Sequence, residues 1–297
     1  MSHTHEMRRP RIALTVGDPA GIGPEIVAKA AADPSVLAVC EPVVFSAPPN
    51  PAIRVGQVSG VAGLAAYETL LRAVDAATGG EVDAIATAPI SKLAFAEAGL
   101  PWKGHTELLG HLCGARQVAM MFHAPQLRVV LITVHVPLAD VPRLMTRELV
   151  ERILTLTAAS LPRFGIRAPR IALAGLNPHA GEAGVLGCEE EAVLTPAVAA
   201  VRARGIDASG PYPADTVFVR ASRGEFDCVV ACYHDQGLIP VKLLAFGQAV
   251  NVTLGLPIIR TSVDHGTAFD IAGKGVADPG SMIEAVKLAA MLARQNL

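Results

Sequence analysis

Short apolar runs rich in β-branched residues alternate along the chain with longer amphipathic stretches rich in Ala and Leu. The apolar runs predict β-strands, and several are almost continuously apolar, as strands buried on both faces of a parallel sheet are. The predicted strands cover residues 11–16, 82–88, 127–136, 170–176, 226–233 and 249–256. The amphipathic stretches predict helices over residues 24–32, 62–80, 146–165 and 188–205. This alternation is typical of an α/β fold.

The composition indicates a globular protein with a small-molecule partner. Apolar residues make up 51% of the 297-residue chain and charged residues only 18%, which supplies a large core for one or two domains. The formal net charge is -2 without a long single-sign run, so we expect neither nucleic acid nor a membrane surface as partner. No stretch reaches the roughly 18 apolar residues of a membrane span, and the polar start lacks a signal-peptide core. We therefore expect a cytoplasmic protein.

Two groups of potential metal ligands are set aside. The five cysteines form no C-x-x-C pair, so neither a disulfide framework nor a thiolate zinc site is expected. Cys228 and Cys232 are interpreted as buried strand thiols. His3 and His5 form an H-x-H pair, but they lie at the very start of the chain, where termini fray. The candidate ligands are therefore histidines further along the chain.

Residues 17–24 (GDPAGIGP) form a glycine-rich turn between a predicted strand and the start of a predicted helix. Free amides at such a helix end favour an anion, and glycine allows a ligand to approach closely. The spacing matches neither the dinucleotide fingerprint G-x-G-x-x-G nor the P-loop. An anion-binding turn and a plain structural turn both stay open.

Histidines follow three of the predicted strands. His135 ends LITVHV, His179 lies in GLNPHAGE and His234 lies in CYHDQG, while His105 lies beside turn residues in KGHTE. Because the carboxyl ends of parallel strands share one edge of a sheet, we expect the first three to converge there. Three imidazoles suit zinc, cobalt or nickel and leave one coordination position for a substrate. Taken singly, each histidine is also compatible with a hydrogen-bonded structural role.

Polar residues in apolar segments downstream of His234 indicate an anionic ligand. Lys242, Asn251 and Arg260 each lie in a mainly apolar segment, where an unpaired charge is costly. A phosphorylated or carboxylated substrate would supply their partner, and so would internal salt bridges to Asp215, Asp235 or Asp264. The Gly-rich segment that follows, residues 262–280, suits either a nucleotide or simple close packing.

Six motifs carry a resemblance to a known family. They are GDPAGIGPEI, GHTE, NPHAGE, PADTVF, YHDQGLIPVK and NVTLGLPIIRTSVDHGTAFDIAGKG. In this order, from residue 12 to about residue 290, the chain resembles the 4-hydroxythreonine-4-phosphate dehydrogenase family. That family belongs to the isocitrate/isopropylmalate dehydrogenase fold, whose similar HGSAPDIAGKG loop lies against the adenosine part of NAD. Here Phe269 replaces the proline of that loop.

The resemblance implies a fold of two α/β/α lobes with the active site in the cleft between them, and this fold explains the missing dinucleotide fingerprint. We expect residues 1–100 and 272–297 in the first lobe. Residues 101–271 would form the second lobe, which carries the metal ligands and the dimer interface. The family is a homodimer in which residues of both chains complete each active site.

The resemblance also implies the roles of individual residues. The metal ligands are His135, His179 and His234. The substrate-binding residues are His105, Thr106, Lys242, Asn251 and Arg260. The loop that binds the cofactor contributes His265, Gly266, Asp270 and Gly273.

The implied activity is a metal-dependent oxidation with a divalent metal (Zn²⁺, Mg²⁺ or Co²⁺) and NAD or NADP as cofactors. 4-Phosphooxy-L-threonine is oxidised to its 3-oxo acid and decarboxylated to 3-amino-2-oxopropyl phosphate, in pyridoxal phosphate biosynthesis. Lys242 is the expected catalytic group for stabilising the enolate and returning a proton. Asp235 or Asp215 is the expected proton acceptor, and the spacing does not choose between them.

Three alternatives remain beside this activity. The motifs IPVKLLAF and GLPIIRTS resemble those of a related branch of the family. That branch oxidises D-threonate or D-erythronate 4-phosphate to dihydroxyacetone phosphate. A further branch acts on cyclic dihydrodiols of aromatic dicarboxylates, but Asn251 and Arg260 are retained here as in the phosphate users. An alternative of another class is a phosphate acyltransferase, which needs neither a metal nor nicotinamide.

Overall fold

The structure of the protein is a computed structural model that describes residues 8–295, so His3 and His5 lie outside the described residues. The chain divides into two compact units. Unit 1 comprises Met1–Ala115 and Leu256–Leu297, and unit 2 comprises Arg116–Gly255. The family resemblance predicts boundaries near residues 100 and 271, which would put His105 and Arg260 in the second lobe. In the structure both residues belong to unit 1.

Parallel strands form the sheet of unit 1 in the order β2-β1-β3-β10. They are β1 (Arg11–Thr15), β2 (Glu41–Phe45), β3 (Ala84–Thr87) and β10 (Arg260–Ser262). Every residue of β3 and β10 is buried. The apolar pattern of residues 82–88 therefore correctly predicted a strand covered on both faces.

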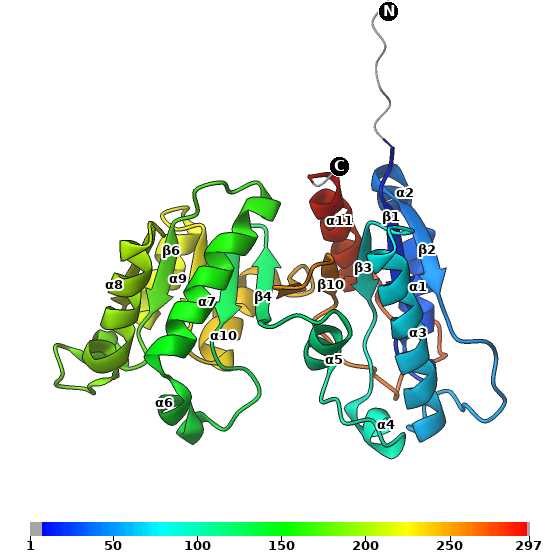
Figure 1. Ribbon diagram of the computed structural model, residues 1–297. Helices are drawn as coiled ribbons and strands as arrows, with labels where there is room; N and C mark the ends of the chain where they lie inside the picture. The colour runs from blue at the N-terminus through cyan, green and yellow to red at the C-terminus, as the bar shows by residue number, and fades with distance from the viewer. Residues whose placement is uncertain (1–7, 296–297) are drawn as a thin grey trace, which may run out of the picture. The chain divides into compact units, whose positions relative to one another are not determined.

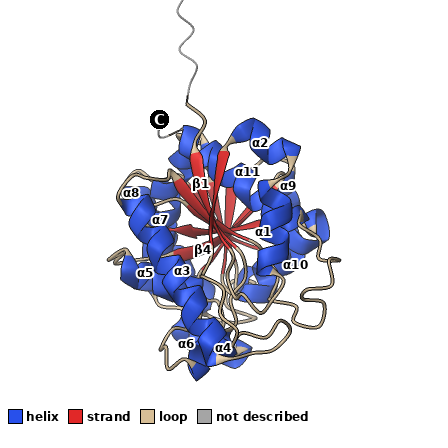
Figure 2. Cartoon of the chain, turned by 90° about the vertical axis from the view of Figure 1, so that its right-hand side faces the viewer, coloured by secondary structure: helices blue, strands red, loops and turns tan. Residues whose placement is uncertain are grey.

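Helices cover both faces of the unit 1 sheet (Figure 2). They are α1 (Gly23–Ala31), α2 (Pro34–Val39), α3 (Gly60–Thr78), α4 (Lys92–Glu97), α5 (His105–Leu112) and α11 (Gly280–Arg294). Helix α11 packs on β1, β3 and β10 beside α1 and α2, whereas α3 packs on β1, β2 and β3 beside α4 and α5. The contact of α5 with α3 and the pairing of β10 with β3 are what place His105 and Arg260 in unit 1.

The sheet of unit 2 is mixed and has the order β9-β4-β5-β8-β6-β7. Its strands are β4 (Ala119–Ala124), β5 (Leu127–Leu131), β6 (Ile171–Ala174), β7 (Ala208–Tyr212), β8 (Cys228–Ala231) and β9 (Val250–Leu254). Only Pro125 and Gln126 separate β4 from β5, which makes this pair an antiparallel hairpin. Strands β5, β8, β6 and β7 are parallel, so their carboxyl ends lie at one edge.

Helices α7 and α8 lie in front of the unit 2 strands in Figure 1, and α9 and α10 lie behind them. The helices are α6 (Val141–Leu144), α7 (Arg147–Ser160), α8 (Thr195–Ala203), α9 (Ala214–Ser222) and α10 (His234–Ala245). Single turns are η1 (Leu138–Asp140), η2 (Leu161–Phe164), η3 (Pro178–Gly181) and η4 (Glu190–Leu194). The core beneath α9 and α10 joins Val129 and Val229 of the sheet to Val217 and Val241 of the helices.

The predicted α/β class is confirmed, and the differences have local causes. The run at residues 127–136 is a strand only as far as Leu131, after which Thr133 donates its amide to the carbonyl of Cys232. The helix predicted at residues 188–205 begins as the one-turn π-helix η4 and continues as α8, where Pro196 cannot donate a backbone hydrogen bond. Cys228 and Cys232 are buried free thiols, as predicted. Among the residues described, no helix is long and apolar enough to cross a bilayer.

Candidate active site

The carboxyl ends of β5, β8 and β6 lie next to one another in unit 2 and precede the predicted metal ligands. His135 follows β5, His234 opens α10 directly after β8, and His179 lies in turn η3 after β6. The rings of His135 and His234 have centroids 5.6 Å apart and planes tilted by 42°. Two histidines that are distant in sequence are thus adjacent, because parallel strands present their carboxyl ends at the same edge.

Asp235 contacts His234, one member of this pair, directly. Its Oδ1 lies 2.7 Å from Nδ1 of His234, and the exposed fractions of the two side chains are 73% and 39%. A carboxylate at Nδ1 fixes the orientation of the imidazole and leaves Nε2 available to a ligand. Asp235 therefore orients His234, whichever further role it has.

His179 lies in η3, a conformationally restricted loop. His179, Ala180, Glu182 and Ala183 have φ values of 52°, 53°, 45° and 52°, in the left-handed region that side-chain-bearing residues rarely adopt. The His179 side chain is exposed. Within residues 8–295, no three His, Cys, Asp or Glu side chains gather so that they could hold a metal ion. Of the three predicted ligands, His135 and His234 are thus in ring contact within the described chain.

Arg260 and His105 are polar residues of unit 1, and the charge of Arg260 acts on the imidazole of His105. Arg260 is 2% exposed and donates from Nη2 to Oγ1 of Thr87 over 2.7 Å. Burial lowers the pKa of its guanidinium to about 9, so the group remains a cation at neutral pH. Burial, and then the charge of Arg260, lowers the pKa of His105 well below its ordinary value, so this imidazole is neutral. The buried Nε2 of His105 has no hydrogen-bond partner.

The other predicted substrate residues differ in exposure. Thr106 is half-buried in the first turn of α5, beside His105. Lys242 is exposed in the last turn of α10, with Nζ 6.0 Å from the ring centroid of Phe246. Asn251 is half-buried in β9, and its Oδ1 is a buried acceptor without a partner. His105 and Asn251 therefore each present a buried polar atom that a ligand would satisfy.

The turn between β1 and α1 packs tightly against neighbouring segments. The amide of Ala20 bonds to Oδ1 of Asp18, and the amide of Ile22 bonds to the carbonyl of Thr267. A Cβ atom at Gly23 would lie 1.9 Å from the carbonyl oxygen of Val16. The amides of Ala20 and Ile22 are thus bonded within the protein, and Gly23 is needed for close packing.

The predicted cofactor loop is bonded to helix α1. Glu25 of α1 accepts from the amides of Gly275 and Ala277, and Lys29 donates to the carbonyls of the same two residues. His265 is half-buried, while three other predicted cofactor residues are exposed, namely Gly266, Asp270 and Gly273. The loop is anchored at its carboxyl end and presents these residues to solvent. Asp215, the second predicted proton acceptor, is exposed in the first turn of α9.

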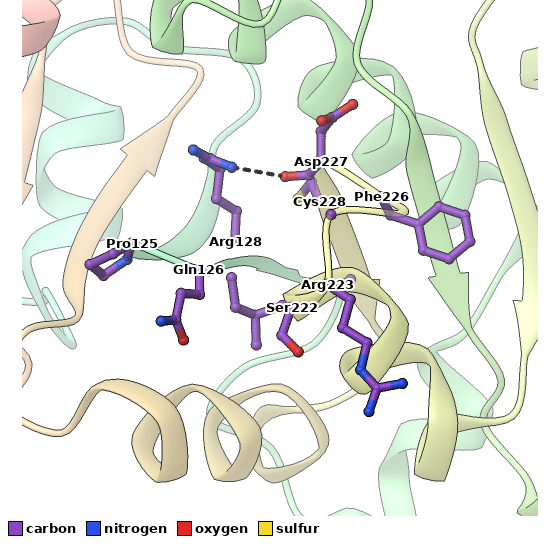
Figure 3. A pocket seen from close by; sticks show the side chains of 11 residues that line it. Pro125, Gln126, Arg128, Ser222, Arg223, Phe226, Asp227 and Cys228 are labelled. Atoms are coloured by element: carbon purple, nitrogen blue, oxygen red, sulfur yellow. Dashed lines mark hydrogen bonds between the residues drawn. The ribbon is translucent and has the colours of Figure 1, made fainter.

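A cavity of about 360 Å³ lies at the opposite edge of the unit 2 sheet, where β5 and β8 begin (Figure 3). Arg128 and Asp227 are among the residues that line it, and Nη1 of Arg128 donates to the carbonyl oxygen of Asp227 over 3.4 Å. Its lining comes from residues 125–128, the end of α9 and residues 226–228. None of the predicted site residues lines this cavity, so it is separate from the histidine pair.

Sequence reasoning missed the residues that support the site. Gln236 and Glu190 are buried, and each accepts hydrogen bonds at a strand end that precedes a histidine. Thr87 pairs with Arg260. Gln236 lies in the YHDQG motif, two residues after the predicted ligand His234. This position was the signal that the sequence offered. Glu190 stands among three consecutive glutamates in CEEEAV, which look like an exposed helix surface, so the sequence held no signal for it.

Comparison with known proteins identifies the family. The model of the pyridoxal phosphate biosynthetic protein PdxA matches residues 18–289. D-threonate 4-phosphate dehydrogenase from Cupriavidus necator is 45% identical, over 97% of this chain and 98% of that protein. 4-Hydroxythreonine-4-phosphate dehydrogenase from Geobacter metallireducens is 46% identical, over 96% of each chain. The 4-hydroxythreonine-4-phosphate dehydrogenase structure from Klebsiella pneumoniae is 41% identical over 96% of this chain and 98% of that one, with a TM-score of 0.88.

More distant structures share the fold alone. Isocitrate dehydrogenase from Methylococcus capsulatus aligns with a TM-score of 0.53 at 19% identity, and a branched-chain phosphotransacylase from Enterococcus faecalis with 0.58 at 13%. The first confirms the predicted isocitrate dehydrogenase-like fold, and the second shows that this architecture also occurs in a transferase. Matched by the family model over most of its length, and by dehydrogenases across nearly whole chains, the protein belongs to the PdxA family of oxidoreductases.

Proposed function

We propose that this protein is a divalent-metal-dependent, NAD(P)-linked dehydrogenase that oxidises 4-phosphooxy-L-threonine to its 3-oxo acid and decarboxylates it to 3-amino-2-oxopropyl phosphate. The observation that carries the proposal is the contact of His135 with His234 where parallel strands end. The names of the relatives support a phosphorylated hydroxy acid as substrate. In chemical terms, hydride leaves the carbinol carbon for NAD(P), and the hydroxyl proton goes to a base. The bond to the carboxylate then breaks, and a proton returns to carbon.

The histidine pair fits a divalent cation. Imidazole nitrogens are ligands that zinc and cobalt favour, and the distance of 5.6 Å between the ring centroids lets both rings reach one ion. When bound, the cation would lower the pKa of the substrate hydroxyl and stabilise negative charge on its oxygen. Asp235 orients His234 for this role. We propose His135, His179 and His234 as the complete ligand set.

The buried groups of unit 1 fit a phosphate. Arg260 is a cation that burial keeps from water, and His105 has a buried Nε2 that can donate to a phosphate oxygen. The hydroxyl of Thr106 is a further donor next to His105. In unit 2, Oδ1 of Asn251 can accept from a hydroxyl or an ammonium group of the substrate. These groups would bind and orient the substrate.

Two acids and a lysine are proposed for the proton transfers. Lys242 is an exposed ammonium group on α10, the helix that His234 opens, and would stabilise the enolate and return a proton to carbon. Asp235 or Asp215 would accept the hydroxyl proton, and their contacts differ. Asp235 bonds to His234, whereas Asp215 stands free of that pair at the start of α9. His265, Gly266, Asp270 and Gly273 are proposed to bind NAD(P).

We further propose that the protein is a homodimer whose active site includes residues of both copies. Ile239 and Leu243 lie one turn apart on α10 and are exposed, and Phe246 directly after the helix is 81% exposed. Leu138 and Val185, in the loops that follow β5 and β6, are also exposed. Exposed apolar residues on the elements that carry the histidines are typical of a surface that another chain covers. The proposed dimer would complete the ligand set that one chain leaves incomplete.

D-threonate 4-phosphate, or D-erythronate 4-phosphate, is the second candidate substrate. The relative from Cupriavidus necator, named for D-threonate 4-phosphate, is as similar to this chain as those named for 4-hydroxythreonine 4-phosphate. 4-Phosphooxy-L-threonine carries an amino group beside the carboxylate, whereas the second candidate carries a hydroxyl there. The same residues would oxidise either substrate. Oxidation and decarboxylation of D-threonate or D-erythronate 4-phosphate would yield dihydroxyacetone phosphate.

The test is an assay of the purified protein with the three phosphorylated acids and with NAD or NADP. We expect absorbance of the reduced cofactor with one acid, loss of the signal with EDTA, and recovery when Co²⁺ or Zn²⁺ is added back. A phosphate acyltransferase would reduce no nicotinamide and would not respond to EDTA, so that result would overturn the proposal. The expected cytoplasmic location remains a prediction.

A further inference from the structure

Gln236 ties together the strand ends that precede His179 and His234. Its Oε1 accepts from the amide of Cys232 over 2.6 Å, and its Nε2 donates to the carbonyl of Gly175 over 2.7 Å. Cys232 follows β8 and Gly175 follows β6. Since the side chain is buried, both bonds are shielded from water. The ends of β8 and β6 therefore hold a fixed position relative to each other.

Glu190 continues this arrangement into the loop that carries His179. Its Oε1 accepts from the amides of Leu176 and Asn177 over 2.8 and 2.7 Å, and its Oε2 accepts from Nδ2 of Asn177 over 2.9 Å. The carboxylate is only 3% exposed. A buried carboxylate is costly unless donors surround it, and here the donors all come from the loop itself.

The contacts of Glu190 lie on both sides of His179. Asn177 stands two residues before the histidine, and Gly181 two residues after it. A Cβ atom at Gly181 would lie only 2.8 Å from Oε2 of Glu190, so the carboxylate packs directly against this glycine. Between these two points, His179 and Ala180 hold left-handed backbone conformations, which persist only where the surroundings enforce them.

We propose that Glu190 is a positioning residue that holds the His179 loop in its ligand-binding conformation through the amides of Leu176 and Asn177 and the side chain of Asn177. The inference deepens the proposed function and rests on it, because His179 is one of the proposed ligands. Glu190 itself would contact neither the cation nor the substrate. Its effect reaches the cation through the loop, as the outer partners of metal ligands do.

Glu190→Gln tests this with little change in shape. If the variant amide keeps its oxygen toward the two backbone amides, its NH₂ group faces Nδ2 of Asn177, and two donors oppose each other. Rotating the Asn177 amide would turn its oxygen toward Oε2 of Glu189, which now accepts from Nδ2 over 2.7 Å. Either arrangement loses a hydrogen bond, so the loop loses part of its restraint.

The measurement is the dissociation constant of Co²⁺ for the full-length protein, from competition with a chelating dye, together with the visible absorption of bound Co²⁺. For Glu190→Gln we expect a dissociation constant about 10 to 100 times that of the wild type. Turnover at saturating Co²⁺ should return to near the wild-type value, because only the loop's positioning is weakened. Glu191→Gln is the matched control, since it removes the same charge from an exposed neighbouring side chain and should bind Co²⁺ like the wild type.

A folded Glu190→Gln protein that binds Co²⁺ as tightly as the wild type would overturn the inference. If this variant fails to fold by thermal melting, Asn177→Ala decides, because it keeps Glu190 on the backbone amides and removes the side-chain bonds of Asn177 to Glu190 and Glu189. It should weaken Co²⁺ binding by a smaller factor, and wild-type affinity would contradict the inference. Failure of the proposed function is distinct, since the wild type itself would then bind no Co²⁺ or reduce no NAD(P).

Discussion

At the scale of single residues, Lys242 offers a clean separation of chemistry from folding. Its side chain is exposed, so Lys242→Ala should leave the melting temperature unchanged. Loss of a proton donor and of enolate stabilisation should lower kcat by about 100-fold or more, with the KM for NAD(P) changed by less than about twofold. Steady-state kinetics give both constants, and Lys92→Ala, which alters an exposed lysine of unit 1, is the control. Wild-type turnover in Lys242→Ala would reject its catalytic assignment.

His123 links stability to pH. It pairs across from Arg128 and stacks on Phe164 with centroids 5.7 Å apart. Burial, and then the charge of Arg128, lowers its pKa from 6.5 to about 4. The unfolded chain thus binds this proton at a higher pH than the folded chain, so the free energy of unfolding falls as pH drops from 6.5 toward about 4.

The contribution of His123 to this decrease in the free energy of unfolding should reach at most about 3 kcal/mol across that pH range. Urea unfolding at a series of pH values measures it, and His123→Gln should show a shallower decline than the wild type. The lowered pKa of His105 acts in the same direction, so part of the decline should remain in the variant. An identical decline in both proteins would mean that His123 does not carry the effect.

At the scale of elements, strands were predictable where burial made them continuously apolar, as in β3, β6 and β8. Strand β10 was missed because its sequence, RTS, is polar. Its burial comes from tertiary packing, which includes contacts with β3 and α11. Helix α10 was missed because Pro240 and the polar start HDQG interrupt the helical pattern. In the site, the sequence predicted that His135 and His234 stand at the ends of strands. It did not predict the buried hydrogen bonds of Gln236, because these depend on tertiary contacts.

Gln236→Leu tests how strongly the ends of β6 and β8 depend on one side chain. The variant leaves the amide of Cys232 and the carbonyl of Gly175 buried without the bonds that Gln236 supplies. We expect the free energy of unfolding to fall by about 2 to 6 kcal/mol, at about 1–3 kcal/mol for each unsatisfied group. Urea titration measures the change. Gln248→Leu, at an exposed position, should cost much less, and equal losses in both variants would refute the role of Gln236.

At the scale of the whole molecule, the α/β class follows from alternating periodicity, but the division into units does not. The segment around residue 105 has no linker composition, and α5 joins unit 1 through its contact with α3. The chain then returns to unit 1 at Leu256, because β10 pairs with β3. Both connections depend on contacts between residues distant in sequence, which periodicity does not report.

The proposed dimer also belongs to this scale. Leu243 is 81% exposed on α10, so Leu243→Glu should leave the fold of a single chain intact while placing a charge in the proposed interface. We expect sedimentation to show monomers and turnover to fall by about 100-fold or more. Leu64→Glu, which alters an exposed leucine on α3 of unit 1, should remain dimeric and active. A dimeric, active Leu243→Glu protein would move the interface elsewhere.

The most direct test of the central claim is anomalous diffraction from crystals of the Co²⁺-loaded protein, measured at the cobalt absorption edge. The account predicts one strong peak per chain, bounded by the imidazoles of His135 and His234 and by His179 of the same or a neighbouring chain. A peak surrounded by other side chains, or no peak in a protein that still reduces NAD(P) with a phosphorylated acid, would contradict it.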